Sequence, residues 1–163
     1  ALRASVTGHL VLSTVHTNDA IATIARLEDL GVAPYLIATG VMAIINQRLI
    51  RKLCGYCKVK KVFNKNEVLE LGVDENLLTK EHFEIYEPCG CEACNNTGFM
   101  GREAIIEILE VSHHIADLNS NSASSVELLK SAKESGMLSL KDDGHLKVLD
   151  GITSFSEIRR VVL

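Results

Sequence analysis

Two C-x-x-C pairs constrain the fold of this chain more than any other feature: Cys54 with Cys57, and Cys91 with Cys94. Four thiolates from two such pairs can close the tetrahedral shell of a structural zinc ion, with zinc–sulfur distances of about 2.3 Å. The 33 residues between Cys57 and Cys91 exceed the roughly 15–20 residues of a common zinc ribbon. We therefore expect the metal to hold the base of a small inserted subdomain.

Two other interpretations of the cysteines stay open at this point, namely a redox dithiol and buried thiols without metal. The fifth cysteine, Cys89, offers an alternative to Cys91, because C-G-C-E-A-C can supply a pair in two ways. One unpaired thiol and the lack of a signal-peptide pattern predict a reducing compartment. Paired cysteines there bind metal more often than they form disulfides.

The composition favours a globular chain with no nucleic-acid partner. The 163 residues are 47% apolar, which suffices for one domain or one and a half. Basic and acidic residues, 17 and 21, are mixed along the chain, aromatic residues make up 4%, and the net charge is −4. A nucleic-acid surface would show a basic patch or stripe. The most apolar stretch, residues 36–45, is too short to span a bilayer and predicts a buried helix.

The first third of the chain predicts part of an α/β core. Residues 9–15 form a short apolar run typical of a central strand covered on both faces. Asn18 or Asp19 is expected to cap a helix that ends at Gly31. A second helix is expected over residues 34–53, with Pro34 in its first turn and a basic end. The parallel partner strands are expected upstream of Ala1.

The remaining sequence predicts two further segments after the core segment of residues 1–53. Residues 54–101 are expected to form the metal-binding subdomain, with a helix at 66–72 and a strand at 83–87. Residues 102–163 are expected to form a return strand at 104–111 and a helical subdomain. Its helices are predicted at 113–118, 124–135, 138–149 and 156–162, the third interrupted near Gly144, with Ser124 or Ser125 and Ser154 as caps.

A second notable segment is T-G-H-L-V-L-S-T-V-H-T-N-D, residues 7–19, with His9 and His16 at the two ends of the predicted strand. Ligands of open α/β sheets bind at the carboxyl ends of the strands. A histidine there can donate a hydrogen bond to a phosphate oxygen or position a water. The pattern equally allows His16 to be a polar residue satisfied at a strand end, with Thr14 and Thr17 as helix caps.

Three motifs in order resemble one family. The segment A-L-R-A-S-V-T-G-H-L-V-L-S-T-V-H-T-N-D-A resembles the histidine box of the type II secretion and type IV pilus assembly ATPases. The cysteine pairs followed by T-G-F-M-G-R resemble the four-cysteine zinc motif of its assembly branch. The tail from S-G-M-L to F-S-E-I is similar to the family's last helical segment. Retraction ATPases of the family lack the cysteine pairs, so the resemblance implies an extension or secretion motor.

The resemblance implies a hexameric ring of RecA-like domains that hydrolyses ATP with Mg²⁺ and drives pilus or pseudopilus assembly through an inner-membrane platform protein. The motor would lie in the cytoplasm, peripheral to the bacterial inner membrane. His9 and His16 would lie near the γ-phosphate, and Cys54, Cys57, Cys91 and Cys94 would bind zinc. Arg48 and Arg51 lie where basic residues could face phosphate or a neighbouring subunit; the alternative is a basic helix end that the helix dipole favours.

One departure from the family pattern limits the expected activity. The sequence contains no G-x-x-x-x-G-K-[ST] phosphate loop, and the magnesium-binding carboxylate would lie on an upstream strand. We therefore expect a C-terminal part of the motor that does not hydrolyse ATP alone. The alternatives are a stand-alone zinc-ribbon interaction or nucleic-acid module and a thiol oxidoreductase with an exposed, low-pKa C-x-x-C.

Overall fold

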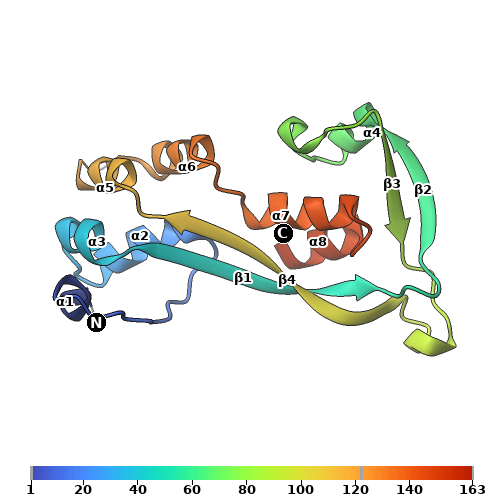
Figure 1. The fold of residues 1–163 in the computed structure, drawn as a ribbon, viewed down its shortest axis with the longest axis horizontal. Helices are drawn as coiled ribbons and strands as arrows, with labels where there is room; N and C mark the ends of the chain where they lie inside the picture. The colour runs from blue at the N-terminus through green and yellow to red at the C-terminus, as the bar shows by residue number, and fades with distance from the viewer. Residues whose placement is uncertain (1, 122, 163) are drawn as a thin grey trace. The chain divides into compact units, whose positions relative to one another are not determined.

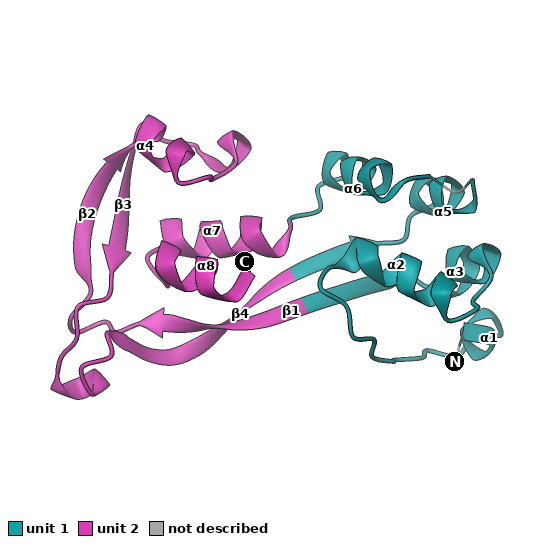
Figure 2. Cartoon of the chain, turned by 180° about the vertical axis from the view of Figure 1, so that it is seen from behind, with its two compact units in different colours: residues 1–46, 107–138 teal, residues 47–106, 139–163 magenta. Residues whose placement is uncertain are grey.

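The computed structural model describes residues 2–121 and 123–162 and divides the chain into two compact units. Unit 1 comprises residues 1–46 and 107–138, and unit 2 comprises residues 47–106 and 139–163 (Figure 2). Strands β1 (Ala43–Leu53) and β4 (Phe99–Glu110) pair with each other, and each continues from one unit into the other. The fold is mixed α/β, as predicted from the sequence.

Unit 1 consists of five helices and the adjoining ends of β1 and β4. The helices are α1 (Leu2–Val6), α2 (Ala20–Asp29), α3 (Pro34–Gly40), α5 (His113–Ser120) and α6 (Ser125–Glu134) (Figure 1). The buried side chains that form its core are Ala20, Ile21, Ile24, Leu109, Ile115, Leu128 and Ala132. The prediction of α2 is confirmed: Asp19 Oδ1 accepts a hydrogen bond from the Ala22 N–H at 2.6 Å, and Gly31 follows the helix with φ 82°.

The predicted strand at residues 9–15 is wrong. This segment has no regular secondary structure, and Leu10 and Leu12 are 84% and 90% exposed. A strand exists only where its N–H and C=O groups pair with a neighbour. None of the strands in the described part of the chain pairs with residues 9–15. The apolar composition of residues 9–15 therefore suits a strand, but no described strand pairs with them.

The predicted helix at residues 34–53 is correct only in its first part. Helix α3 ends at Gly40, and residues 43–53 form strand β1, in which exposed and less exposed side chains alternate. Pro34 opens α3 as expected, but Ile44, Ile45 and Ile50 are β-branched and suit a pleated surface. Pairing with β4, which begins at Phe99, far from β1 in the sequence, decides the conformation.

Among the described residues, unit 2 contains the rest of β1 and β4, a hairpin, three α-helices and two 3-10 turns. Strand β2 (Val59–Asn64) pairs antiparallel with β3 (His82–Glu87), from Val59 opposite Glu87 to Asn64 opposite His82. The helical elements are α4 (Lys65–Glu70), the 3-10 turns η1 (Glu75–Leu77) and η2 (Glu92–Cys94), α7 (Leu140–Leu149) and α8 (Phe155–Val162). The core of unit 2 includes Ile50, Val68, Ile85, Ile105 and Val148.

Helix α7 is continuous through Gly144, so the predicted interruption is wrong. A Cβ atom at Gly144 would lie 2.8 Å from Ile158 Cδ1, so the missing side chain lets α8 pack closely on α7. The other helices of residues 102–163 are confirmed to within two residues, with Ser124 capping α6 through Glu127. Strand β4 begins at Phe99, earlier than predicted, because it continues directly from the second cysteine pair.

Candidate metal centre

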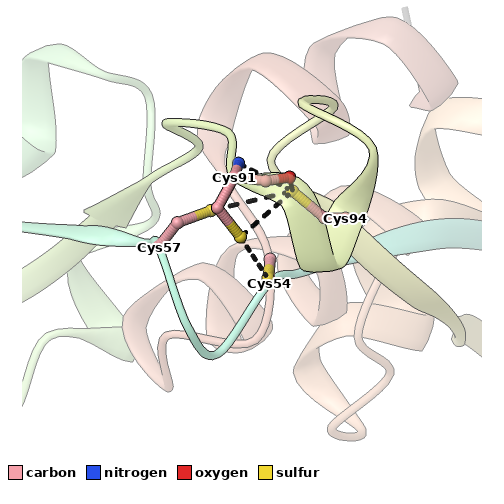
Figure 3. A group of neighbouring side chains, drawn as sticks. All are labelled: Cys54, Cys57, Cys91 and Cys94. Carbon is pink, nitrogen blue, oxygen red and sulfur yellow. Dashed lines mark hydrogen bonds between the residues drawn. The ribbon is translucent and has the colours of Figure 1, made fainter.

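The four cysteines of the two C-x-x-C pairs come together in unit 2, where two strand ends meet. Cys54 and Cys57 lie in the turn between β1 and β2, and Cys91 precedes the 3-10 turn η2, whose last residue is Cys94, before β4 (Figure 3). The Cys54 N–H donates to the Gly98 carbonyl at 2.9 Å and joins the two turns. The residues between the two pairs include the β2–β3 hairpin.

The sulfur atoms have the spacing of a tetrahedral site. The Sγ–Sγ distances are 3.9 Å for Cys54–Cys91, 3.9 Å for Cys57–Cys94 and 3.7 Å for Cys91–Cys94. All four sulfurs lie within 4.8 Å of one another. A tetrahedron with metal–sulfur bonds of about 2.3 Å has edges of about 3.8 Å. The donor set and its dimensions therefore fit one metal ion bound by four thiolates.

Backbone N–H groups supply the hydrogen bonds that thiolate ligands require. The Gly90 N–H donates to Cys57 Sγ, and the N–H groups of Cys91 and Gly98 donate to Cys94 Sγ, each at 3.2 Å. Such bonds orient the ligands of a metal site and stabilise their negative charge. The two bonds to Cys94 arise within the tight turn of the second pair, whereas the Gly90 bond joins the segment before that pair to Cys57.

The pKa values of two of the four cysteines are shifted in opposite directions. Burial raises the pKa of the Cys57 thiol to about 12, against the smaller lowering effect of the Gly90 N–H. Burial also acts to raise the pKa of Cys94, but hydrogen bonds from Cys91 and Gly98 lower it to about 6. Closely spaced thiols therefore titrate unequally. A bound divalent cation is the charge that allows all four to be thiolates.

The structure decides between Cys91 and Cys89. Cys89 is exposed and lies outside the four-sulfur cluster. Gly90 has φ 117°, and a Cβ there would lie 2.9 Å from the Asn96 carbonyl oxygen, so the chain bends sharply between the two cysteines. This bend directs Cys91 into the cluster. The structure therefore brings Cys91, the residue expected to pair with Cys94, to the other three cysteines, and Cys89 stays outside.

The same geometry disfavours a disulfide or redox pair. Each cysteine is free, and sulfur separations of 3.7–3.9 Å are far above the roughly 2.05 Å of a disulfide bond. Cys94 is 5% exposed and Cys54 is fully buried. Cys57 and Cys91 are partly exposed, so it is the sulfur separations and the meeting of four sulfurs that favour a metal site over a redox pair.

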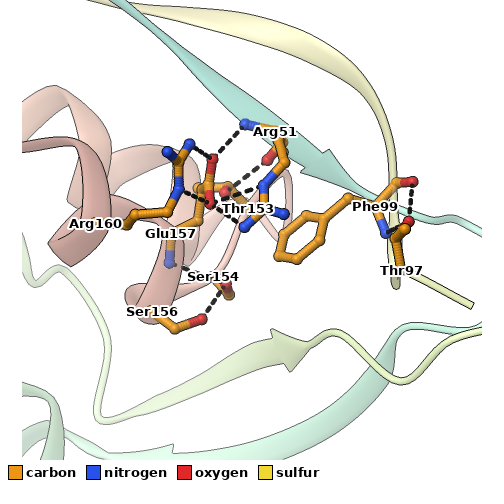
Figure 4. A network of polar contacts seen from close by, with 8 residues as sticks. All are labelled: Arg51, Thr97, Phe99, Thr153, Ser154, Ser156, Glu157 and Arg160. Carbon is orange, nitrogen blue, oxygen red and sulfur yellow. Dashed lines mark hydrogen bonds and ion pairs between the residues drawn. The ribbon is translucent and has the colours of Figure 1, made fainter.

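A buried carboxylate, Glu157 at the start of α8, organises the strand that leads to the metal centre (Figure 4). Its Oε1 accepts from the Arg51 N–H at 2.9 Å, and its Oε2 accepts from Arg51 Nε at 3.0 Å and Nη2 at 2.6 Å. Arg160 donates to both oxygens, at 2.9 and 2.6 Å. Burial acts to raise the pKa of Glu157, but the hydrogen bonds from Arg160 and Arg51 outweigh it and hold the pKa at about 2.

The sequence did not reveal this network. Ser154 and Glu157 suggest only a local helix start, and the Glu157 N–H does receive that local bond from Ser154 Oγ at 3.4 Å. The partner Arg51 lies 106 residues away and also stacks on the Phe99 ring, with Cζ 4.1 Å from the ring centroid. Phe99 directly follows the second cysteine turn, so the network connects α8 with the metal centre.

The predicted arginine sites differ in their surroundings. Arg48 makes a marginal contact with the Gln47 carbonyl at 3.5 Å, whereas Arg51 is held by Glu157. Arg51, Arg102 and Arg160 line an open cavity of about 350 Å³. Glu103 pairs with Lys52 at 3.6 Å, which is consistent with a structural role for that residue.

His9 and His16 both lie in the irregular segment of unit 1 and are exposed. His9 Nδ1 is 3.2 Å from Thr7 Oγ1. The polar residues that follow His16 have local roles, because Thr17 bonds Thr23 at 2.7 Å and Asp19 caps α2. In the described part of the chain, no helix combines the length and apolarity needed to cross a bilayer.

Comparison with known proteins places these features in a family. The family model described as "Type II/IV secretion system protein" matches residues 1–160. The chain is 41% identical over 162 residues to the type IV pilus assembly ATPase TfpB of Acinetobacter baylyi, with 99% of this chain and 27% of that protein covered. It is 40% identical over 161 residues to the type II secretion system protein E of Pseudomonas aeruginosa, with 99% and 31% covered.

A third relative, the type IV pilus assembly ATPase PilB of Thermus thermophilus, is 38% identical over 158 residues, with 97% of this chain and 18% of that protein covered. The chain thus spans less than a third of the length of each of these relatives. The family match extends over nearly the whole sequence and includes the histidine segment, the four cysteines, helix α7 and most of α8. The chain belongs to the type II/IV secretion system protein family.

Proposed function

We propose that this chain is part of an ATP-hydrolysing motor that drives type IV pilus assembly or type II secretion. The observation that carries the proposal is the family match over residues 1–160, with relatives that are pilus assembly and secretion proteins. In this proposal residues 1–53 belong to a RecA-like ATPase core, and residues 102–163 form the return strand and helical subdomain. The motor works as a hexameric ring on an inner-membrane platform protein, at the cytoplasmic face.

We propose that the metal bound by residues 54–101 is zinc with a structural role. Four thiolates at tetrahedral spacing are the ligand set that zinc favours, and a closed shell leaves no position for a reacting molecule. Cys54, Cys57, Cys91 and Cys94 would hold the ion, which would fix the hairpin β2–β3 to the start of β4. Elemental analysis of chelator-washed, folded protein should give one zinc per chain. A ratio near zero would refute this assignment.

We propose that His16 and His9 act on the γ-phosphate of ATP in the complete motor. Both side chains are exposed in a segment without regular structure, so neither is committed to the core of unit 1. A neutral imidazole can donate to a phosphate oxygen or position the attacking water. ATP and Mg²⁺ would bind mainly through a phosphate loop that this sequence does not contain, so we expect the chain alone to be inactive.

Arg48 and Arg51 are further candidates for contact with phosphate or a neighbouring subunit. Arg48 is not fixed by an ion pair in the described structure, and Arg51 uses its backbone N–H, Nε and Nη2 on Glu157. Any nucleotide contact of Arg51 would therefore use Nη1, while its bond to Glu157 keeps the guanidinium in place.

Turnover measurements in the full-length motor test the histidine assignment. His16→Ala should lower ATP turnover by about 10²–10³-fold, because loss of one group that stabilises the transition state typically costs this much. Zinc content, ring assembly and melting temperature should remain unchanged. His9→Ala should behave similarly. Normal turnover in both variants, or loss of turnover only through unfolding, would show that the histidines are structural.

A further inference from the structure

The hydrogen bonds nearest to His16 lie directly after it in the sequence, within unit 1. Residues 10–16 make no hydrogen bond with any residue that the structure describes. Two residues after His16, the Asn18 carbonyl accepts a hydrogen bond from Asn46 Nδ2 of β1 at 2.6 Å. The place of His16 within unit 1 therefore depends on what holds the residues that follow it.

A second bond to these residues comes from a buried carboxylate of β4. Glu107 is 4% exposed, and its Oε1 accepts from the buried Ala20 N–H at 2.7 Å, across 87 residues of sequence. Ala20 is the first residue of α2, and its N–H has no acceptor within the helix. The local cap of α2 is Asp19, which accepts from the Ala22 N–H at 2.6 Å. Glu107 therefore adds a contact that local capping does not supply, between the start of α2 and β4, where the helix dipole favours a negative charge.

Both bonds come from one face of the paired strands β1 and β4. Side chains two residues apart on a strand share a face, so Asn46 lies on the face of Ile44, and Glu107 on the face of Leu109. Leu109 belongs to the core of unit 1 together with Ala20, and Ile44 packs against that core. The apolar side chains of this face thus hold α2 on the strands, and its two polar side chains bond to the chain just before and at the start of α2.

We propose that Glu107 and Asn46 are positioning residues for His16. They hold residues 18–20 on β4 and β1, so that the His16 imidazole keeps one position relative to the γ-phosphate. The inference rests on the role proposed above for His16, and it assigns neither side chain a contact with the nucleotide. Asn18 is only two residues from His16, so a shift of one moves the other. A misplacement of about 1 Å can lower turnover by up to about 10²-fold.

Turnover of the full-length motor over a range of ATP concentrations tests the positioning role. Asn46→Ala should lower kcat by about 10–10²-fold and leave KM for ATP unchanged, because positioning affects the transition state rather than nucleotide binding. Glu107→Ala should act in the same direction. Glu107→Gln keeps an oxygen that can accept from the Ala20 N–H, so it should recover most of the kcat that Glu107→Ala loses. Asn46→Ala removes an exposed hydrogen bond and carries the test if Glu107→Ala does not fold.

A double-mutant cycle with His16→Ala distinguishes positioning from a general structural role. If Asn46 acts through His16, Asn46→Ala should lower kcat by less than about twofold in the His16→Ala background, because the imidazole that it positions is gone. A full independent loss in that background, or normal kcat in both Asn46→Ala and Glu107→Ala, would overturn the positioning role and leave the assignment of His16 intact. Normal turnover in His16→Ala itself would instead remove the proposed function, and this inference with it.

Two control variants in unit 1 account for effects of charge and of stability. Glu110→Ala makes the same change as Glu107→Ala three residues later on β4, where the side chain is exposed, and kcat should be unchanged. Ser124→Ala removes the cap of α6, which accepts from the Glu127 N–H at 3.3 Å. It should lower the melting temperature but not kcat measured below the transition. A loss of kcat in either control equal to that in Asn46→Ala would refute the proposal.

Discussion

Cys91→Ser and Cys89→Ser form a matched pair that tests the metal centre, because the same chemical change is made two residues apart. Cys91 Sγ lies 3.7 Å from Cys94 Sγ and 3.9 Å from Cys54 Sγ, whereas Cys89 is exposed and outside the cluster. A structural zinc site of four ligands contributes about 10–16 kcal/mol. One ligand's share is about 3 kcal/mol, which corresponds to a loss of zinc affinity on the order of 10²-fold.

Competition with a chromophoric chelator measures the zinc affinity of each variant, and amide hydrogen exchange shows which residues lose protection. Cys91→Ser should weaken zinc binding on the order of 10²-fold and speed exchange first at residues 54–57 and 90–98. The Gly90 and Gly98 amides are the most informative, because they donate to sulfur. Cys89→Ser should leave affinity and exchange unchanged. Equal loss in the two variants would show that the ligand set inferred from the sulfur distances is wrong.

Three other outcomes are expected. Glu157→Gln should lower the free energy of unfolding at pH 7 by about 2 kcal/mol, because Arg51 and Arg160 are about half exposed and solvent screens the bonds. The folded pKa of Glu157 is about 2, below its ordinary value of 4.5, so this stabilisation is complete above pH 4.5 and is lost as the pH falls toward 2. Urea titrations between these pH values measure it. A difference in the free energy of unfolding between wild type and variant that stays constant over this range would contradict the expectation. Gly144→Ala should destabilise the chain by about 1–3 kcal/mol, because the new methyl group would overlap with Ile158. Gly55→Ala should not destabilise it, because the space around Gly55 is open. Equal melting temperatures for wild type and Gly144→Ala would disprove the packing argument. Calorimetric titration of the chain with a non-hydrolysable ATP analogue and Mg²⁺ should show no micromolar binding, because this sequence contains no phosphate loop. Micromolar binding would mean that the nucleotide site has been misplaced.

The sequence by itself determined the features that depend on residues close together along the chain. Asp19 and Ser124 accept bonds from N–H groups three residues ahead, so local spacing narrows each cap to one of two adjacent residues. Gly31 ends α2 because it accepts a positive φ. The two C-x-x-C pairs likewise predict a four-thiolate site, since each pair is a local turn whose spacing suits one metal ion.

Tertiary structure alone decided the features that depend on distant partners. Residues 43–53 are a strand rather than a helix because β4 pairs with them, and residues 9–15 are not a strand because no described strand does. Cys91 rather than Cys89 joins the cluster because the bend at Gly90 directs it there. Arg51 meets Glu157 across 106 residues. Local hydrogen bonds are encoded within a few residues, whereas strand ladders and buried ion pairs exist only after distant segments meet.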